Sequence, residues 1–276
     1  MSVTDISVII PVYNSQKTIT ECIDSVVCEL CATDYSWELV LVDDGSTDDS
    51  LEMLYRFKEA SLHSGQIRII SQTNKGAASA RNTGIKASSG AFIAFNDSDD
   101  KWLPGKIKSQ MDYLLNHPQA DLAGGAHEEV HGSYFKNLKR VNPIGIKDMV
   151  LKNYFSPQAV VIRKKALDDT GLLFDESMRS GFEECSLFYP LTYYRNCILM
   201  NEVVTKSITG KRRWGDSGLS GNIWAMKEGE LYNIKNAYRS GFISFGWYLT
   251  AYILSLLKFS RRLLICEKRK LCEKGM

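Results

Sequence analysis

The sequence predicts an α/β fold, in which a mixed, mainly parallel sheet is flanked by helices and followed by a helical C-terminal extension. Continuous apolar runs alternate with helical patterns over the first 125 residues, which is typical of parallel βαβ units. Acidic clusters follow two of these runs. From residue 216 onward a helical pattern dominates and ends in a run of Lys and Arg, which predicts the extension.

The first half of the chain contains five expected strands. Each is a short run rich in apolar residues, as expected for a strand buried on both faces of a sheet. The runs are 6–13, 37–45, 66–71, 91–95 and 120–125. Four helical patterns lie between them: one that follows Ser15 as its cap, one over 46–57, one of small residues over 76–88, and one that Pro104 opens.

Beyond residue 125 the alternation changes. Residues 127–149 are polar and irregular, a strand is expected over 158–164, and a helix is expected over 183–195. From Trp224 onward the pattern is helical. We therefore divide the chain into 1–125 and 126–215, as two halves of one domain, and an extension over 216–276.

Composition excludes some classes of protein and indicates a compartment. The 276-residue chain is 44% hydrophobic and 24% charged, which is ordinary for a globular protein. Its formal net charge of +2 argues against nucleic acid as a partner. Seven cysteines, an odd number, do not suggest a disulfide framework, and the N-terminus lacks the basic region of a signal peptide. We therefore expect a cytoplasmic chain.

Two acidic clusters directly follow expected strands. Asp43 and Asp44 end the second strand, and Asp97, Asp99 and Asp100 follow the fourth. Repulsion between unit charges a few ångströms apart costs about 1 kcal/mol in water and several times more where water is scarce, so these clusters need a compensating cation or a role. Ligands of open α/β sheets bind outside the carboxyl ends of the strands. If the two strands are neighbours, both clusters face one cleft.

A divalent cation bound together with a nucleotide diphosphate explains such carboxylates. Mg²⁺ takes oxygen ligands, often one or two carboxylates with phosphates and water. Arg81 adds a cation at the small-residue helix, where a phosphate or a base can approach closely. For each cluster taken alone, solvated turn chemistry is the alternative, because Asp and Ser are good turn and cap residues.

Three segments resemble the family-2 glycosyltransferases of the GT-A fold. They are "SVIIPVYN" (7–14), "VLVDDGSTDDS" (40–50) and "NKGAASARNTGIKASSGAFIAFNDSDDKW" (74–102). The resemblance extends over residues 6–116 in order and at the family's spacing, and it becomes loose beyond residue 125. It implies that 1–125 binds a nucleotide sugar, that 126–215 binds the acceptor, and that a UDP-sugar is the favoured donor.

The resemblance also implies roles for individual residues on the donor side. Asp44 would accept a hydrogen bond from a ring N–H of the base, Arg81 would lie beside the base or the phosphates, and Asp97 would contact the ribose or the donor sugar. Asp99 would hold Mn²⁺ or Mg²⁺ against the diphosphate, where a cation stabilises the charge on the leaving group. The full set of implied nucleotide-sugar-binding residues is Pro11, Val12, Tyr13, Asp43, Asp44, Asn74, Arg81, Asp97 and Ser98.

The catalytic base of the family is the second acid of a Glu-Asp pair that precedes a helix. In this chain "FDESMRSGFEECSLF" (174–188) places Glu183 and Glu184 at that pair. We expect Glu184 to deprotonate the acceptor hydroxyl in a single displacement with inversion. Because Glu is one methylene longer than Asp, Glu183 remains the alternative base, and a nucleotide-sugar-binding protein without transferase activity remains the alternative function. Two acids at a helix start are also favourable dipole chemistry.

Candidate acceptor or phosphate contacts lie at the end of the third resembling segment and in the less regular part of the chain. They are Trp102, His127, Arg212, Arg213 and Trp214. His127 opens "HEEVH" (127–131), which matches a zinc-binding motif that works only on a helix. Neighbouring Gly124, Gly125 and Gly132 instead favour a loop or a strand on the acceptor side. A basic loop with one packing tryptophan is the alternative for 212–214.

The extension predicts contact with a membrane surface through residues 242–274. Residues 242–257 carry no charge, and as a helix they would span roughly 24 Å, short of the roughly 30 Å hydrocarbon core. Many Lys and Arg follow, as in a helix that lies on an anionic leaflet. Packing on the catalytic domain or a homodimer interface is the alternative. Contact with the inner face of the cell membrane would suit a glycan acceptor on a lipid diphosphate, which the family resemblance implies for bacterial surface polysaccharide (O-antigen or capsule) assembly.

Overall fold

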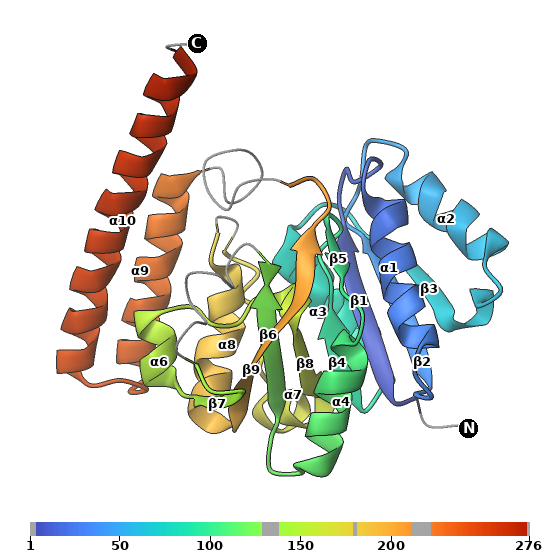
Figure 1. Ribbon diagram of the computed structural model, residues 1–276, viewed down its shortest axis with the longest axis horizontal. Coiled ribbons are helices and arrows are strands. Elements are labelled where there is room, and N and C mark those ends of the chain that lie inside the picture. The colour runs from blue at the N-terminus through green and yellow to red at the C-terminus, as the bar shows by residue number, and fades with distance from the viewer. Residues whose placement is uncertain (1–3, 129–137, 179–180, 211–221, 275–276) are drawn as a thin grey trace.

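The computed structural model describes residues 4–128, 138–178, 181–210 and 222–274. Within these residues, one nine-stranded mixed sheet runs through the molecule (Figure 1). The strand order is β3-β2-β1-β4-β8-β6-β9-β5, and β7 pairs with β9. The strands are β1 (Ile6–Val12), β2 (Trp37–Asp43), β3 (Ile67–Ser71), β4 (Phe92–Phe95), β5 (Asp100–Trp102), β6 (Leu122–His127), β7 (Val141–Ile144), β8 (Val160–Arg163) and β9 (Cys197–Ser207).

Helices pack on both faces of the sheet and create two cores. One core lies between the sheet and α1, α2 and α4, and the other lies between the sheet and α3, α6 and α8. β1 contributes to both, with Ile9 in one core and Val8 and Ile10 in the other, as the two-residue period of a strand requires. The helices are α1 (Ile19–Cys31), α2 (Ser50–Ala60), α3 (Ala77–Ala87), α4 (Lys106–Asn116), α6 (Ile146–Leu151), α7 (Lys164–Thr170), α8 (Glu183–Tyr194), α9 (Ile223–Arg239) and α10 (Phe245–Lys274).

The predicted mixed α/β arrangement is confirmed. β1 pairs in parallel with β2 and β4, and β2 pairs in parallel with β3. β8 runs antiparallel to both β4 and β6, whereas β6 and β9 are parallel. The sequence pattern did not indicate β5, β7, β9, α6 or α7. β5 is only three residues long and lies inside the acidic cluster, where no apolar run marks it.

The two acidic clusters lie at one edge of the sheet, although the strands that carry them are not neighbours. β2 and β4 lie on either side of β1. Because all three strands are parallel, their carboxyl ends meet at the same edge. The loops after β1, β2 and β4 therefore come together there, and β1 lies in the middle.

Pro11 marks the point where β1 and β4 separate. Their pairing ends at Ile9 and Phe95, and the Asn96 N–H donates to the Ile9 carbonyl oxygen at 3.0 Å. Since backbone groups alternate in direction along a strand, the N–H that Pro11 lacks would face the β4 side, beyond the last paired residue. Proline therefore removes no hydrogen bond of the ladder at this position of a central strand.

The start of α1 differs from the expected one. Ser15 was expected to cap this helix, but α1 begins at Ile19, and the Ser15 side chain caps no helix N–H. The Ser15 carbonyl oxygen accepts the N–H groups of Thr18 and Ile19 at 3.0 and 2.9 Å, which forms a turn before the helix. Ser15 therefore belongs to the loop after β1 and is available to contact the other loops at this edge.

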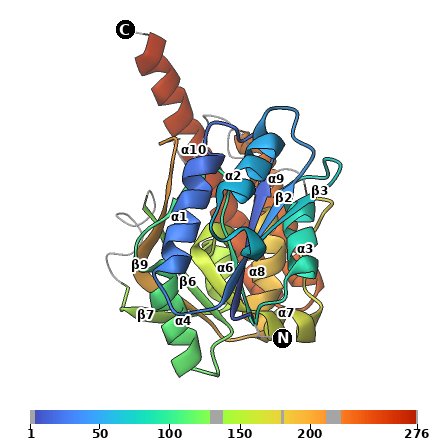
Figure 2. The same cartoon turned by 90° about the vertical axis from the view of Figure 1, so that its right-hand side faces the viewer.

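The two C-terminal helices pack against each other at the end of the molecule that lies away from β1 and β2 (Figure 1). The C-terminal end of α10 extends past the rest of the fold (Figure 2). One face of α10 is buried through Ala251, Ser255 and Phe259, so the expected alternative of packing on the catalytic domain holds for that face. Large apolar side chains on α10 are nevertheless exposed: Phe245, Leu249, Ile253, Leu256, Leu257 and Leu264. Among the described helices, none is long and apolar enough to cross a membrane.

Candidate active site

Side-chain hydrogen bonds connect the three loops at the carboxyl edge of the sheet. Asn14, in the loop after β1, accepts the N–H of Thr47 in the loop after β2 at 2.8 Å. The Asn14 backbone has a φ of 49°, a left-handed conformation that Asn tolerates better than most residues. The hydroxyl oxygens of Ser15 and Ser98 lie 2.6 Å apart and join the loop after β1 to the loop after β4. Hydrogen bonds therefore join the loops after β1, β2 and β4 into one surface at this edge.

Asp43 and Asp44 are buried at this edge, with 1% and 2% of their surface exposed. The Asp44 carboxylate accepts the N–H groups of Lys75 and Gly76 at 2.9 and 2.8 Å and the side-chain amide of Gln72 at 2.7 Å. These bonds place a negative charge at the N-terminus of α3, where the helix dipole favours it. The expected contact of Asp44 with a base remains a prediction, and the structure adds a second role for Asp44 in orienting α3.

Arg81 is the buried cation of the site. It is 4% exposed, and it donates to Asp97 Oδ1 at 2.6 Å and to Glu183 Oε1 at 3.3 Å. Its guanidinium lies 5.4 Å from the centroid of the Phe174 ring. Burial lowers the pKa of Arg81, but the charges of Asp97 and Glu183 outweigh burial and raise it. Its side chain faces these two carboxylates, because a buried cation requires paired anions. The expected position of Arg81 beside the base or the phosphates stays a prediction.

The acidic loop after β4 divides its carboxylates among different partners. Asp97 is paired with Arg81, and Asp100 Oδ1 lies 3.4 Å from His127 Nε2. Burial raises the pKa of Asp100, and the hydrogen bond with His127 opposes that rise. Asp99 lies between these two residues and is half-buried. Asp97 and Asp100 each have a separate partner, Arg81 and His127. These two contacts explain how the fold accommodates several acids in so short a loop.

The carboxylate oxygens of this loop suit a cation that the protein would hold with few ligands of its own. Within the described part of the chain, no three His, Cys, Asp or Glu side chains are arranged as a metal cage. Mg²⁺ and similar hard cations are often held by one or two carboxylates, with substrate phosphates and water as the other ligands. Asp99 and the half-buried Asp97 provide oxygen atoms of this type at the predicted position.

Glu183 and Glu184 open α8 and have different surroundings. Glu183 is 7% exposed and is paired with Arg81, whereas Glu184 accepts the side-chain amide of Asn153 at 2.8 Å. Burial, and then the negative charge of Glu183, raise the pKa of Glu184 to about 8. Glu184 is therefore a much stronger base than an ordinary carboxylate once its proton has left.

Asn82 connects α3 to the segment that leads into α8. Its side-chain amide donates to the Phe174 carbonyl oxygen and to Glu176, both at 2.9 Å, and its Oδ1 accepts the Phe174 N–H at 2.9 Å. Sequence reasoning named neither Asn82 nor Asn153 as a site residue. Asn82 lies next to Arg81 inside a segment that carries the family resemblance, so a signal existed, but nothing around Asn153 in the sequence marks it.

The other predicted site residues have different outcomes. Tyr13 is 49% exposed and Asn74 is exposed, both in loops at the carboxyl edge, whereas Pro11 and Val12 are buried within β1. His127 ends β6, whereas Glu128 directly after it is helical, so the expected loop or strand over the zinc-like motif holds for His127 and is wrong for Glu128. Residues 129–131 of the zinc-like motif lie outside the described residues, as do the candidate acceptor contacts Arg212, Arg213 and Trp214.

Trp102 was expected to contact an acceptor or a phosphate, and the structure corrects this prediction. Trp102 is 3% exposed and lies in the core shared by the sheet and α4. Its ring N–H donates to the Gln158 carbonyl oxygen at 3.2 Å, and the ammonium of Lys106 lies 4.6 Å from the ring centroid. A ring covered by protein in this way cannot stack on a sugar.

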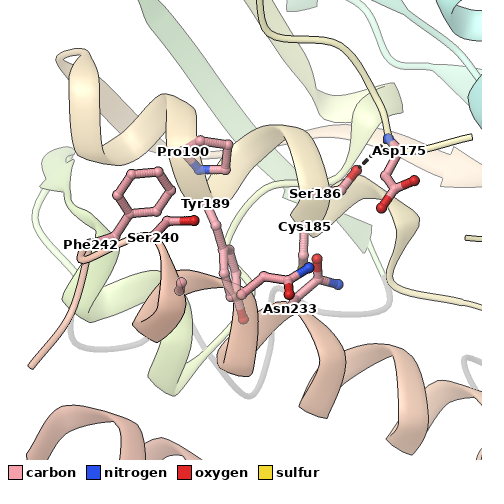
Figure 3. Close-up of a pocket in the computed structure, with 10 residues that line it drawn as sticks. Asp175, Cys185, Ser186, Tyr189, Pro190, Asn233, Ser240 and Phe242 are labelled. Atoms are coloured by element: carbon pink, nitrogen blue, oxygen red, sulfur yellow. Dashed lines mark hydrogen bonds between the residues drawn. The ribbon is translucent and has the colours of Figure 1, made fainter. Parts of the chain in front are cut away.

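A separate cavity of about 250 Å³ lies between α8 and α9 (Figure 3). Asp175 and Ser186 lie at one end of it, where the Asp175 N–H donates to the Ser186 hydroxyl at 2.9 Å, and Phe242 lies at the other end. None of the predicted donor-binding residues lines this cavity. It is therefore distinct from the edge of the sheet where the carboxylates gather.

Comparison with known proteins identifies a family and individual relatives. The sequence model of the family "Glycosyl transferase family 2" matches residues 7–171 of this chain. The chain is similar to the UDP-Glc:alpha-D-GlcNAc-diphosphoundecaprenol beta-1,3-glucosyltransferase WfgD of Escherichia coli, with 40% identity over 113 residues. The match covers 41% of this chain, and the chain spans 42% of the length of that relative.

Solved structures share the fold. TarS of S. aureus (residues 1–349), in complex with UDP-GlcNAc, has a TM-score of 0.66 and 22% identity, over 91% of this chain and 71% of that one. The mannosyltransferase PcManGT of Pyrobaculum calidifontis, in complex with GDP-Man and Mn²⁺, has a TM-score of 0.66 and 18% identity, over 96% of this chain and 79% of that one. These likenesses confirm the predicted GT-A fold.

We expect Arg81→Ala to lower the free energy of unfolding by about 3–5 kcal/mol, because the change leaves the buried Glu183 and the half-buried Asp97 without their cation. Arg56→Ala is the matched control, since Arg56 is 73% exposed and pairs with Glu52 on the surface. The control should change stability by less than about 1 kcal/mol. Urea unfolding of the three proteins measures both effects, and equal losses in the two variants would contradict the assigned role of Arg81.

Glu184 should make stability depend on pH in a predictable direction. Its carboxyl binds a proton more tightly in the folded protein, with a pKa of about 8, than in the unfolded chain, where the ordinary value is about 4.3. Stabilisation by this proton is complete below the unfolded value and is lost as pH rises through the folded value. We expect wild type to lose on the order of 1–3 kcal/mol relative to Glu184→Gln between about pH 5 and about pH 9. Parallel stability curves for the two proteins in urea titrations would contradict this expectation.

Proposed function

Since the chain belongs to glycosyl transferase family 2, we propose that it transfers a sugar from a UDP-sugar to a hydroxyl group of a glycan acceptor, with inversion at the anomeric carbon. The observation that carries this proposal is the pairing of Arg81 with Asp97 and Glu183. Asp97 belongs to the acidic loop proposed for the donor, and Glu183 belongs to the pair proposed for the base. The buried guanidinium of Arg81 therefore holds the loop proposed for the donor next to the Glu pair proposed for the base.

The proposed donor site is the connected edge formed by the loops after β1, β2 and β4. Tyr13 and Asn74 offer exposed side chains there, and Asp44 and Asp97 offer carboxylates for N–H and hydroxyl groups of a nucleoside. UDP is favoured because the name of the Escherichia coli relative specifies UDP-Glc and because the TarS structure contains UDP-GlcNAc. We propose the same nucleotide for this chain.

Asp99, with Asp97 beside it, would hold Mn²⁺ or Mg²⁺. When bound, such a cation neutralises negative charge on the departing diphosphate. Contacts on either side of Asp99 hold the loop in place. Arg81 pairs with Asp97, and His127 lies within hydrogen-bond distance of Asp100. The mannosyltransferase with a similar fold was solved with Mn²⁺, which supports a divalent cation as the proposed cofactor.

We assign the base to Glu184 rather than to Glu183. Glu183 is paired with Arg81, so its carboxylate already has a buried cation as its partner. Glu184 faces the amide of Asn153 and has a pKa raised to about 8. In the proposed step Glu184 accepts the proton of the acceptor hydroxyl while that oxygen forms a bond to the anomeric carbon and the bond to the nucleoside diphosphate breaks. The nucleoside diphosphate departs with the electron pair.

We propose that the acceptor is carried on a lipid diphosphate and that α10 lies on the membrane that holds it. The name of the Escherichia coli relative specifies a diphosphoundecaprenol-linked GlcNAc acceptor, which supports a role in bacterial polysaccharide biosynthesis. The exposed apolar residues of α10 provide a surface for the boundary of a leaflet, and Arg261, which is exposed among them, provides a positive charge. We therefore propose that the protein works at the inner face of the cell membrane.

The first experiment is hydrolysis and transfer from a panel of nucleotide sugars with Mn²⁺ and a membrane extract as the acceptor source. We expect turnover of one donor, which Glu184→Gln slows by about 10²- to 10⁴-fold through loss of the base. We expect Asp99→Ala to lower turnover at least about 100-fold, because it removes the proposed cation ligand.

Asp168→Ala is the control for these variants, since Asp168 is exposed on α7 and pairs with Lys164. Wild-type turnover by Glu184→Gln, together with loss of turnover in Glu183→Gln, would move the base to Glu183. Donor binding without turnover by the wild type would favour a nucleotide-sugar-binding protein instead.

Membrane contact is tested by co-sedimentation with vesicles. We expect wild type to bind vesicles that contain phosphatidylglycerol and to bind pure phosphatidylcholine vesicles more weakly, because each basic residue near an anionic surface contributes about 1 kcal/mol. The double variant Ile253→Glu, Leu257→Glu should lose binding, since both side chains are exposed on α10. Leu62→Glu, at a residue that is 99% exposed away from α10, is the control. Equal binding by wild type and the α10 variant would exclude this surface.

A further inference from the structure

The residue directly before the Glu183–Glu184 pair has an unusual backbone conformation. Phe182 has a φ of 63° and a ψ of 20°, which is the left-handed helical region, and Gly181 before it has a φ of 53°. A bulky side chain is rarely found there, because its Cβ approaches the backbone too closely. Such a conformation persists only where surrounding structure imposes it, and it is frequent at functional sites. The contacts that impose it on Phe182 therefore bear on the proposed base.

Asn233 of α9 holds Phe182 in this conformation. The Asn233 side chain is 4% exposed, and its amide donates to the Phe182 carbonyl oxygen at 2.9 Å and to the Gly229 carbonyl oxygen at 3.0 Å. Figure 3 shows Asn233 at the interface with α8, near Cys185. One side-chain amide therefore binds both the turn that starts α8 and its own helix α9.

Two further contacts fix this turn from the C-terminal helices. A side chain at Gly181 would meet Met226 Cγ of α9 at 3.1 Å, so α9 packs closely on the turn. The guanidinium of Arg262 on α10 lies 5.6 Å from the centroid of the Phe182 ring. Arg262 is itself oriented by Glu230 of α9 at 3.4 Å. The two C-terminal helices therefore hold Phe182 through both its backbone and its ring.

The conformation of Phe182 sets where the Glu184 carboxylate lies. Phe182 is the N-cap residue directly before α8, so its φ and ψ determine the direction in which the first turn leaves the preceding segment. A general base must be within hydrogen-bond reach of the proton it accepts, and a misplacement of about 1 Å can cost about 100-fold in rate. Donor binding uses other elements, namely the loops after β1, β2 and β4.

We propose that Asn233 is a positioning residue for the transfer reaction: its amide fixes the left-handed turn at Phe182, and this turn aims Glu184 at the acceptor. The proposal rests on the function proposed above, and it extends the active site to a residue of the C-terminal extension. It predicts a change in the rate of the chemical step without a change in donor affinity.

The test compares Asn233→Ala with wild type and with Asn236→Ala. Asn236 lies one turn later on α9 and lines the same cavity, so it controls for general loosening between α8 and α9. We expect Asn233→Ala to lower kcat by about 10- to 100-fold with the KM for the donor unchanged. Asn236→Ala should remain within about twofold of wild type. A kcat of Asn233→Ala within twofold of wild type would overturn the proposal.

Changes at residue 182 show whether the effect acts through the backbone. Phe182→Gly and Phe182→Ala both remove the ring, but only glycine adopts the left-handed region without a steric penalty. In the Asn233→Ala background, Phe182→Gly should therefore retain a kcat at least about fivefold higher than Phe182→Ala. Equal kcat values for these two double variants would overturn the backbone mechanism. Thermal unfolding of each variant establishes that folded protein is compared.

Amide hydrogen exchange separates this proposal from the proposed function. It is measured on the full chain without substrate, at the N–H groups of 183–186 that follow the turn. The proposal predicts faster exchange in Asn233→Ala than in Asn236→Ala, and slower exchange in the double variant with glycine at 182 than in the one with alanine. If the wild type turns over no donor, the proposed function fails, and the exchange pattern still decides whether Asn233 holds the turn. Unchanged exchange in Asn233→Ala would overturn the proposal.

Discussion

The buried guanidinium of Arg81 is the constraint around which the site is organised. Burying a charge away from water costs free energy unless an opposite charge lies beside it. The fold must therefore place carboxylates next to Arg81. One comes from Asp97 in the loop after β4, and the other comes from Glu183, which is 102 residues away in sequence from Arg81. These pairings explain why the loop after β4 and the start of α8 must fold against each other.

α3 is the element that carries this constraint. Its N-terminus is fixed by the Asp44 carboxylate through the N–H groups of Lys75 and Gly76, and Asn82 on the helix holds the segment at Phe174. The helix also lies so close to β1 that a Cβ at Gly84 would clash with the side chain of Ile9. Asp44, which the sequence marks as a candidate binding residue, therefore also supports the structure.

The C-terminal helices connect two proposed roles. The buried face of α10 packs through Ala251 and Phe259 and brings Arg262 to the turn at Phe182, whereas the opposite face exposes Ile253 and Leu257. Glu230 ties the helices together, since it pairs with both Lys258 and Arg262. A helix proposed to lie on a membrane is thus in physical contact with the turn that precedes the proposed base.

Local patterns in the sequence determined much of this protein. Apolar runs predicted the strands β1, β2, β3, β4, β6 and β8, because burial on both faces requires them, and the acidic clusters after β2 and β4 indicated the edge at which the site lies. Only the tertiary structure decided which side chains meet there. It turned Arg81 toward two carboxylates, buried Trp102 in the core, and brought Asn153 to Glu184 and Asn233 to Phe182. The physical reason is that periodicity reports which face of an element is buried, whereas ion pairs and amide hydrogen bonds between distant residues depend on how the elements pack together.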